Sequence, residues 1–531
     1  MLPKLIFGGI AVLACLPFLG LILIASRGDL NSISHLFHSV LGAYIWNSVL
    51  LCVGSVLGAL ALGIGSAWLT ARYDFWGKKM LTPLLVLPLA MPVYVVAYVY
   101  ADALQYSGPV QSFLRATFAW SKGDYWFPDM RSLLGACAMF ACVLYPYVYL
   151  LCKDAFVAHG ARYIDVARSL GMHRHKAFWH VALPSARPAW VAGAALVMME
   201  CLADYGAVSY LGVDTFSVGI FRTWFGLADK AGAAQLSICL LVFVAWTVHL
   251  EHHSRDLAQY SAYTAAQARI RLSGLKSLAA AWLCALPILL GFVLPVLLLC
   301  RLWWQDSDSQ WQSPHTLALW HSLWVALLCI AVCVGLAVLF ALYLRQHPTS
   351  PSKYAQQLLA MGYAAPGAVL AIAILWVMSV FEESLGRWSA TLLFTGSVFA
   401  LIYAYTIRFF AIAAGSIDSG LARISKSIDD AANSLGVRGL AACRRIHLPL
   451  LKPSMLSAAL LVFIDCLKEL PATLSLRPFN FNTLATQIHQ FTRDERLAEA
   501  ALPSLLLVGL CTIALLYYYR LSEPGSVSGD T

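Results

Sequence analysis

Charge is scarce in this chain of 531 residues: Asp, Glu, Lys and Arg make up 12%, against 60% that are hydrophobic. A water-soluble domain carries about twice that charged fraction, because its surface faces water. The shortage excludes an ordinary soluble protein and requires that much of the surface face lipid. Apolar runs of about 20 residues, the length that crosses a bilayer as a helix, recur along the whole chain. The composition predicts an all-α polytopic membrane protein.

The sequence also lacks the motifs of several function classes. Its 14 cysteines include no CxxC pair and no Cys/His set with metal-ligand spacing, and most lie in apolar runs, where a thiol packs as a small hydrophobic group. A nucleotide-binding P-loop needs Lys after its second Gly, whereas the best match, Gly415–Gly420, is followed by Leu421. We therefore expect no catalytic residue, no firmly assigned metal site and no cofactor on this chain.

About twelve segments are long and apolar enough to span a membrane. They lie near residues 5–25, 47–70, 81–104, 133–152, 188–211, 233–250, 277–300, 317–344, 357–380, 391–414, 454–476 and 501–519. With these spans, about two thirds of the 36 Lys and Arg residues fall in loops on one side, and basic loops stay in the cytoplasm. Both termini are then cytoplasmic. The net charge of +9 is spread among loops, which argues against a nucleic-acid partner.

One stretch of about forty residues occurs twice, at a constant separation of 265 positions. Residues 165–171 read Asp-Val-Ala-Arg-Ser-Leu-Gly, and residues 430–436 read Asp-Ala-Ala-Asn-Ser-Leu-Gly. A proline follows each glycine thirteen positions later, within a Leu-Pro pair. Chance similarity of apolar helices would not keep one offset through polar, Gly and Pro positions. Both copies lie on the basic side, so the repeat is parallel and indicates a duplication.

The repeated loops have a readable local structure. Their Ala-rich segments favour a short helix, and the Gly that follows can end that helix in a left-handed conformation. We expect a rigid cytoplasmic projection in each half, named here the first knob (residues 161–187) and the second knob (residues 426–452).

These two loops resemble the EAA loop of binding-protein-dependent ABC importer permeases, whose pattern is EAA, three residues, Gly, nine residues and Ile-x-Leu-Pro. Both copies keep the Gly and the Leu-Pro; Asp stands for the Glu in each, and Val166 for the first Ala of the first copy. The resemblance implies two duplicated type I transmembrane domains that form a translocation pathway. The expected coupling residues are Asp165, Ala167, Gly171, Leu183, Pro184, Asp430, Ala431, Ala432, Gly436, Leu448 and Pro449.

The same resemblance implies partners and a location. Each knob would dock as a coupling helix on one of two copies of an ABC ATPase subunit, which would carry ATP–Mg. A periplasmic or extracellular binding protein would deliver the substrate to this chain in the bacterial inner membrane. The predicted organisation is a leading helix at 1–45, the first type-1 domain at 46–252, a cytoplasmic linker with the seventh helix at 253–314, the second domain at 315–520 and a cytoplasmic tail at 521–531.

Ionisable residues occur inside two of the predicted spans. Glu200 and Asp204 are four positions apart and so on one helix face, and Asp465, Lys468 and Glu469 occupy the matching region of the other half. Such groups usually face a partner or a wet cavity. Either they line the pathway as a gate or cation site, or Lys468 pairs with a neighbouring carboxylate and holds the bundle together. The predicted pathway residues are Glu200, Asp204, Tyr205, Asp465, Lys468 and Glu469.

Gly206 lies two positions after Asp204, and Pro471 lies two positions after Glu469. Both residue types weaken a helix, Gly through its backbone freedom and Pro through its missing N–H. We expect the two spans to loosen just beyond Asp204 and Glu469.

The surroundings of these carboxylates also resemble ferric iron importer permeases of bacteria, over residues 200–212 and 221–226 in the first half and 468–480 and 494–500 in the second. The resemblance implies Fe³⁺ as the cargo, and a hard cation does prefer carboxylate and phenol oxygens. Thiamine and phosphonate permeases are alternatives with the same machinery. A secondary transporter driven by an ion gradient is an alternative of another class, although it would not need two cytoplasmic knobs.

Overall fold

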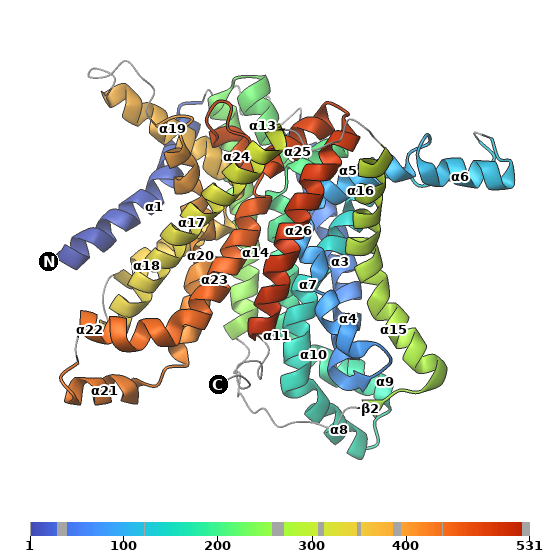
Figure 1. The fold of residues 1–531 in the computed structure, drawn as a ribbon, viewed down its shortest axis with the longest axis horizontal. Coiled ribbons are helices and arrows are strands. Elements are labelled where there is room, and N and C mark those ends of the chain that lie inside the picture. The colour runs from blue at the N-terminus through green and yellow to red at the C-terminus, as the bar shows by residue number, and fades with distance from the viewer. Residues whose placement is uncertain are drawn as a thin grey trace.

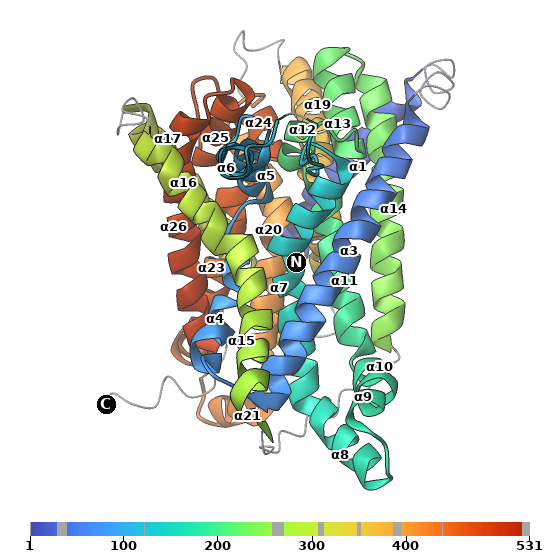
Figure 2. The ribbon, with the colours of Figure 1, turned by 90° about the vertical axis from the view of Figure 1, so that its right-hand side faces the viewer.

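The computed structural model describes residues 2–28, 40–121, 123–256, 270–305, 313–347, 352–385, 394–437 and 439–522. These residues form a bundle of helices with one short parallel strand pair, β1 (Tyr73–Asp74) and β2 (Ile270–Arg271) (Figures 1 and 2). The all-α fold class is thereby confirmed. Most of the predicted tail and parts of the linker at 253–314 lie outside the described residues.

The elements up to the second leading helix are α1 (Leu2–Ser26), α3 (Leu41–Arg72), α4 (Lys78–Leu84), η1 (Leu87–Ala90), α5 (Val93–Leu104), α6 (Pro109–Phe118), α7 (Leu133–Ala155), η2 (Phe156–Gly160), α8 (Ala161–Ser169), α9 (Arg174–Ala177), η3 (Phe178–Ala182), α10 (Leu183–Ser185), α11 (Arg187–Ala203), α12 (Gly206–Tyr210), α13 (Phe216–Phe221), η4 (Arg222–Gly226) and α14 (Lys230–Asp256).

The remaining elements are α15 (Gly274–Ile288), η5 (Leu289–Val293), α16 (Leu294–Gln305), α17 (Ser313–Gln346), α18 (Ser352–Met361), η6 (Gly362–Ala364), α19 (Gly367–Leu385), α20 (Val398–Ala422), α21 (Lys426–Ser434), α22 (Leu440–Ala442), η7 (Cys443–His447), α23 (Leu448–Lys468), α24 (Pro471–Leu476), α25 (Leu484–Arg493) and α26 (Leu497–Ser522).

Ten helical stretches within the described residues are long and apolar enough to cross a membrane, and two bent helix pairs bring the number to twelve. Each of the twelve predicted spans overlaps one of these stretches, so the described helices provide ten spans, or twelve if each bent pair crosses once. The tenth span begins later than predicted, at Val398, because Ser397 caps the helix by accepting a hydrogen bond from the backbone N–H of Ala400.

The third predicted span, residues 81–104, is wrong as a single straight crossing. Its two parts, Lys78–Ala90 and Val93–Phe118, meet at an angle of 92°. Pro92 sits in the break, where it has no N–H to continue the helical hydrogen bonds. The predicted span at 357–380 is also interrupted, since α18 ends at Met361 and α19 starts after Pro366.

The predicted spans at 188–211 and 454–476 are likewise not continuous helices. The first stops at Ala203 and the second at Lys468, each is followed by two non-helical residues, and a short helix then starts at Gly206 or Pro471. This break is the loosening that Gly206 and Pro471 predicted. It recurs in both halves at the same register.

Structural features of the two halves also recur at a separation of 265 positions. Helix α7 starts at Leu133 and α20 at Val398, and Ser132 and Ser397 cap them through the same type of hydrogen bond. A π-helical turn occupies 178–182 in the first half and 443–447 in the second. Shared caps and turns at one offset show that the two halves repeat one fold.

The leading helix of each half packs against the other half. Helix α1 contacts α18 and α19 of the second half and α14 of the first. Helices α15 and α16 contact α4 and α5 of the first half, and α16 also contacts α26. The helices that α1 contacts are the repeat counterparts of those that α15 and α16 contact. Each leading helix therefore helps to hold the two halves together in one bundle. The knobs lie at two separate corners of that bundle, around α8 and α21 (Figure 1).

Candidate functional site

The helix of each knob ends in the same way. Gly171 and Gly436 have φ angles of +88° and +78°, the left-handed region that favours glycine. The N–H of Met172 donates to the carbonyl of Ala167 at 3.0 Å, and the N–H of Val437 donates to that of Ala432 at 2.9 Å. These bonds close a glycine C-cap in each half, as the sequence predicts.

Small alanines of the knobs face the body, and leucines face away from it. Ala167 and Ala432, 265 positions apart, are buried. Leu170 and Leu435, also 265 apart, have 83% and 81% of their surface exposed. A large apolar side chain held outward on a rigid turn gives each knob an exposed apolar tip suited to a protein partner.

The first knob is tied to the bundle by an ion pair between Arg72 and Asp165. Arg72 is the last residue of α3, and its side chain is buried while that of Asp165 is half-exposed. The predicted coupling residue Asp165 therefore holds the knob against α3.

The second knob uses a different carboxylate from the one that the sequence suggested. Asp430 is exposed, whereas Asp429 accepts a hydrogen bond from Nε of Arg345 at 2.7 Å and lies 3.1 Å from Nε2 of His447. Arg345 lies near the end of α17, as Arg72 ends α3, and it also donates to the backbone carbonyls of Leu421, Ile424 and Ser425. The sequence did contain a signal for these two ion pairs: an arginine, Arg72 or Arg345, at the end of the second span of each half.

The other predicted coupling residues lie where the knobs join the membrane helices. Leu183 begins α10 and Leu448 begins α23, both half-buried, and Pro184 and Pro449 follow them on the exposed side. Ala431 is exposed on α21. Each Leu-Pro pair thus sits at the foot of a helix that leads into the membrane region: α11 after a bend of 67° in the first half, and α23 directly in the second.

Asp204 and Glu469 lie in the two helix breaks and cap the short helices that follow. Oδ1 of Asp204 accepts a hydrogen bond from the N–H of Ala207 at 2.8 Å, and Oε1 of Glu469 accepts one from the N–H of Ala472 at 3.0 Å. Ala207 and Ala472 are again 265 positions apart. These two carboxylates therefore have a structural role that the sequence did not predict, namely to stabilise the breaks.

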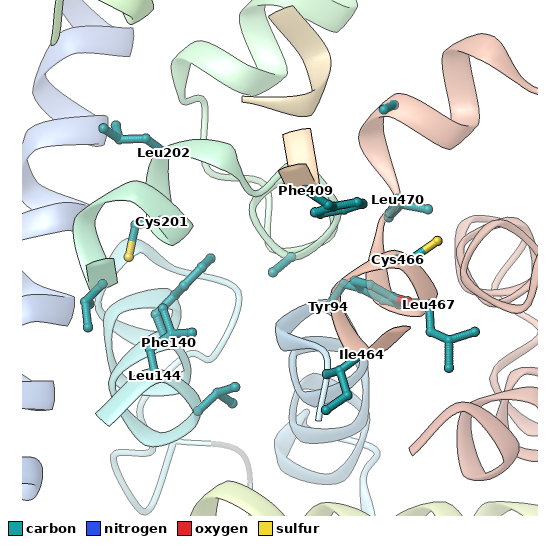
Figure 3. Close-up of a cluster of buried hydrophobic side chains, with 14 of the residues drawn as sticks. Tyr94, Phe140, Leu144, Cys201, Leu202, Phe409, Ile464, Cys466, Leu467 and Leu470 are labelled. Carbon is teal, nitrogen blue, oxygen red and sulfur yellow. The ribbon is translucent and has the colours of Figure 1, made fainter. Parts of the chain in front are cut away.

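The breaks of the two halves face one cavity of about 90 Å³, between α5, α7, α11, α20 and α23. Figure 3 labels three residues of its lining: Tyr94 of α5, Phe409 of α20 and Leu470 of the second break. The polar residues that line it are Tyr147, Glu200, Asp204, Tyr363, Arg408, Asp465, Lys468 and Glu469, together with Tyr94. Five of the six predicted pathway residues are thus brought together.

Charge is distributed unequally between the halves around this cavity. Asp465 lies 3.3 Å from Nζ of Lys468, and Glu469 lies 3.3 Å from Nε of Arg408. Both cations belong to the second half. At the positions 265 residues earlier, the first half has Val143 and Ala203.

Among the described residues, neither carboxylate of the first half forms an ion pair of its own, although the charges of Lys468 and Arg408 also act on Glu200. Glu200 is contacted by the hydroxyl of Tyr147, which donates to Oε1 at 3.4 Å, and Asp204 by backbone N–H groups. With every group ionised, four carboxylates face two cations. The cavity would carry an excess of negative charge on the side of the first half, which favours a cationic occupant.

Arg408 and three tyrosines are cavity residues that the sequence analysis did not predict. Arg408 lies inside α20, within the predicted span at 391–414. The signal was its repeat partner, Val143, an apolar residue. Nothing in the sequence distinguished Tyr94, Tyr147 and Tyr363 from the other 20 of the chain's 23 tyrosines.

Tyr205, the sixth predicted pathway residue, does not line this cavity. Its ring stacks on Phe221 with centroids 4.0 Å apart, and lies 5.8 Å from the ring of His489 on α25. Tyr205 thus joins the break of the first half to a helix of the second.

Within the described residues, no group of three or more His, Cys, Asp or Glu side chains is arranged to hold a metal ion. The carboxylates of the cavity are spread around its wall, and half of them are paired with cations. Such a wall suits brief contacts with a passing cation better than tight binding.

Taken together, the spans, the repeated fold, the two knobs and the shared polar cavity define a polytopic membrane permease with two homologous halves. Residues 59–250, which contain the first knob and the first carboxylate pair, match the family model described as "Binding-protein-dependent transport system inner membrane component". This part of the chain is therefore similar to the inner membrane components of binding-protein-dependent transport systems.

Two similar proteins cover most of the chain. The "Fe(3+)-transport system permease protein FbpB 2" of Haemophilus influenzae is 25% identical over 93% of this chain and 93% of its own length. The "Ferric transport system permease protein FbpB" of Actinobacillus pleuropneumoniae is 23% identical over 88% of this chain and 68% of its own. The "Molybdenum transport system permease protein ModB" of H. influenzae is 27% identical over 38% of this chain and 87% of its own length.

Proposed function

We propose that this chain is the permease subunit of an ATP-driven importer in a bacterial inner membrane, and that its cargo is ferric iron. The observation that carries the proposal is the shared cavity, where carboxylates of both halves meet at the two helix breaks and the charge balance favours a cation. Ferric iron is a hard cation that prefers carboxylate and phenolate oxygens, the polar groups of this wall. The similarity to two ferric permeases over most of the chain agrees with that chemistry.

The knobs are proposed to face the cytoplasm and to dock on two copies of a separate ABC ATPase, which binds ATP–Mg. Their exposed leucine tips and their ion pairs to α3 and α17 support this role. In this orientation α1 starts and α26 ends on the cytoplasmic side, and a periplasmic binding protein delivers the cargo to the opposite end. The domain boundaries at 46–252 and 315–520 remain a prediction of this scheme.

A mechanical link between knob and cavity follows from the chain itself. Helix α11 begins at Arg187, beside the first knob, and ends at Ala203 next to Asp204; α23 runs from Leu448 to Lys468 next to Glu469. Each helix is a rod of about 25–30 Å at 1.5 Å per residue. Movement of a knob with its ATPase would shift the breaks and change the side from which the cavity is open, in the manner of alternating access.

The test is uptake into proteoliposomes that contain this permease, its ATPase and its binding protein. Radiolabelled Fe³⁺ is offered in one arm and radiolabelled thiamine in the other, each with and without internal ATP. ATP-dependent iron uptake is the expected result. ATP-dependent uptake of thiamine alone would keep the permease and replace the cargo, and iron uptake that follows a proton gradient without ATP would overturn the proposed class.

A further inference from the structure

Helix α6 and the loop after it extend sideways from the bundle, at the end away from the first knob (Figures 1 and 2). The first half breaks between α5 and α6, whereas α19 of the second half runs as one helix from Gly367 to Leu385. Residues 386–393, which follow α19, lie outside the described residues. Neither the cavity nor the knobs require α6.

One face of α6 is bound to its own loop by polar contacts. Nε2 of Gln111 donates to the carbonyl of Leu104 at 2.7 Å, and Oε1 accepts from the hydroxyl of Tyr125 at 2.7 Å. The guanidinium of Arg115 donates to the same hydroxyl at 3.1 Å and lies 4.1 Å from the ring centroid of Tyr106. Arg115 is the one charged residue between 103 and 121, and it is turned toward this loop.

The opposite face of α6 is apolar and exposed. Val110, Phe113 and Thr117 follow helical spacing and lie on that face, and Phe113 has 67% of its surface exposed. At the tip, Phe118 stacks on Trp120 with centroids 4.7 Å apart, and both rings remain partly exposed. A ten-residue helix with its one charged residue, Arg115, on one face and with Val110 and Phe113 on the other has the character of a helix that lies in a membrane interface.

The position of α6 in the bundle agrees with that character. It leaves the bundle beside the end of α16, in both views, and α5 contacts α16. Exposed tryptophans, Trp303 and Trp304, mark that end of α16. Tryptophans gather at the level of lipid headgroups, so α6 lies at the depth of a membrane–water interface.

We propose that α6 is an interfacial anchor whose Val110–Phe113–Thr117 face lies on the headgroup–acyl boundary of the leaflet opposite the knobs. The occupant of this face is phospholipid and not the substrate-binding protein. The loop covers the polar face of α6 and leaves the apolar face free on a helix that runs alongside the bilayer. The anchor would fix the outer end of α5, which lines the cavity through Tyr94, while the knobs move.

The test uses the full-length permease in vesicles of phosphatidylethanolamine and phosphatidylglycerol, with the photoreactive residue p-benzoylphenylalanine at one position at a time. Position 113 probes the apolar face, and position 121, in the exposed loop after α6, is the matched control. Position 283 of α15, which is 60% exposed on a membrane-spanning stretch, reports full lipid contact. After irradiation, mass spectrometry measures the fraction of each protein that carries a phospholipid adduct.

The expected result is a lipid adduct at position 113 within about threefold of that at position 283, and at least about tenfold above that at position 121. Equal adduct yields at 113 and 121, or none at 113 while 283 reacts, would overturn the proposal. So would irradiation of intact cells in which position 113 reacts with a protein instead of a phospholipid. Circular dichroism and gel filtration of each variant check that it folds; a substitution at 116, also exposed on α6, replaces position 113 if that variant does not.

Discussion

Arg408 and Glu469 form an ion pair 3.3 Å long inside the membrane-spanning bundle, with both side chains largely buried. The repeat partner of Glu469 is Asp204, but the repeat partner of Arg408 is Val143. The duplicated halves therefore share a helix break and a capping carboxylate, and differ in the charge that compensates it. This difference makes the shared cavity asymmetric.

Arg408→Val gives the second half the residue that the first half has at the matching position, Val143. This substitution should destabilise the protein. Removing one partner of a buried pair leaves the other charge unpaired and costs about 3–5 kcal/mol. Thermal unfolding in detergent measures the loss, and Arg423→Val, at an exposed site, is the control. Adding Glu469→Gln to Arg408→Val should restore part of the stability, because no unpaired charge remains; a double variant as unstable as the single one would contradict this account.

Glu200→Gln should lower iron uptake by about tenfold or more, equivalent to about 1.4 kcal/mol, because it removes a cavity carboxylate that is not held in an ion pair. The measurement is ATP-driven uptake in proteoliposomes, with ATP hydrolysis followed in parallel. Glu383→Gln, an exposed carboxylate of α19, should leave uptake unchanged. If Glu200→Gln transports iron at the parental rate, Glu200 is not part of the pathway.

Leu170→Glu and Leu435→Glu should each weaken binding of the ATPase, and the pair together should abolish it. A buried apolar anchor at an interface contributes about 2 kcal/mol, or about thirtyfold in affinity. Co-purification with the ATPase measures this loss. Leu227→Glu, at a leucine that is 68% exposed at the other end of the bundle, is the control. Unchanged co-purification of the double variant would show that the ATPase docks elsewhere.

His489 should make the protein less stable as the pH falls. Burial, together with the nearby charges of Arg493 and Arg477, lowers the pKa of His489 from 6.5 to about 4. Between these two values the unfolded chain binds a proton that the folded chain does not, so stability is complete above pH 6.5 and decreases from there to about pH 4.

At about 1.4 kcal/mol for each unit, the loss from His489 approaches about 3 kcal/mol. Thermal unfolding as a function of pH checks it, with His489→Gln as the variant that should lose this part of the pH dependence. His173, exposed in the first knob, provides the matched control as His173→Gln. An identical pH profile for parent and His489→Gln would refute the assignment.

Much of the architecture could be predicted because it depends on patterns within short stretches of chain. Hydrophobic runs identify the spans, since a bilayer tolerates few charges. Gly171 and Gly436 predict a left-handed turn, because few other residues adopt that backbone conformation without a free-energy penalty. Gly206 and Pro471 likewise marked the two breaks. Each of these signals lies within a short stretch of chain, so a single sequence was sufficient to predict the feature.

Contacts between residues that are far apart in the sequence could not be predicted in the same way. Asp429 and Asp430 are adjacent and chemically identical, and only the rotation of α21 turns the first toward Arg345 and the second toward solvent. Tyr205 seemed to belong with Asp204, yet the break turns it toward Phe221 and His489. The right-angle turn after Ala90 was not predicted either, because one apolar run continues across it in the sequence.

The sequence by itself determined a twelve-span membrane protein made of two copies of one fold, with a knob in each copy and carboxylates within the membrane. Those features follow from hydrophobicity, from residue-specific backbone preferences and from the constant offset of the repeat. Only the tertiary structure decided that carboxylates of both halves meet at one cavity and that the second half alone supplies the cations. The physical reason is that helix packing and the angles at helix breaks bring together residues that are hundreds of positions apart, and no local pattern encodes those contacts.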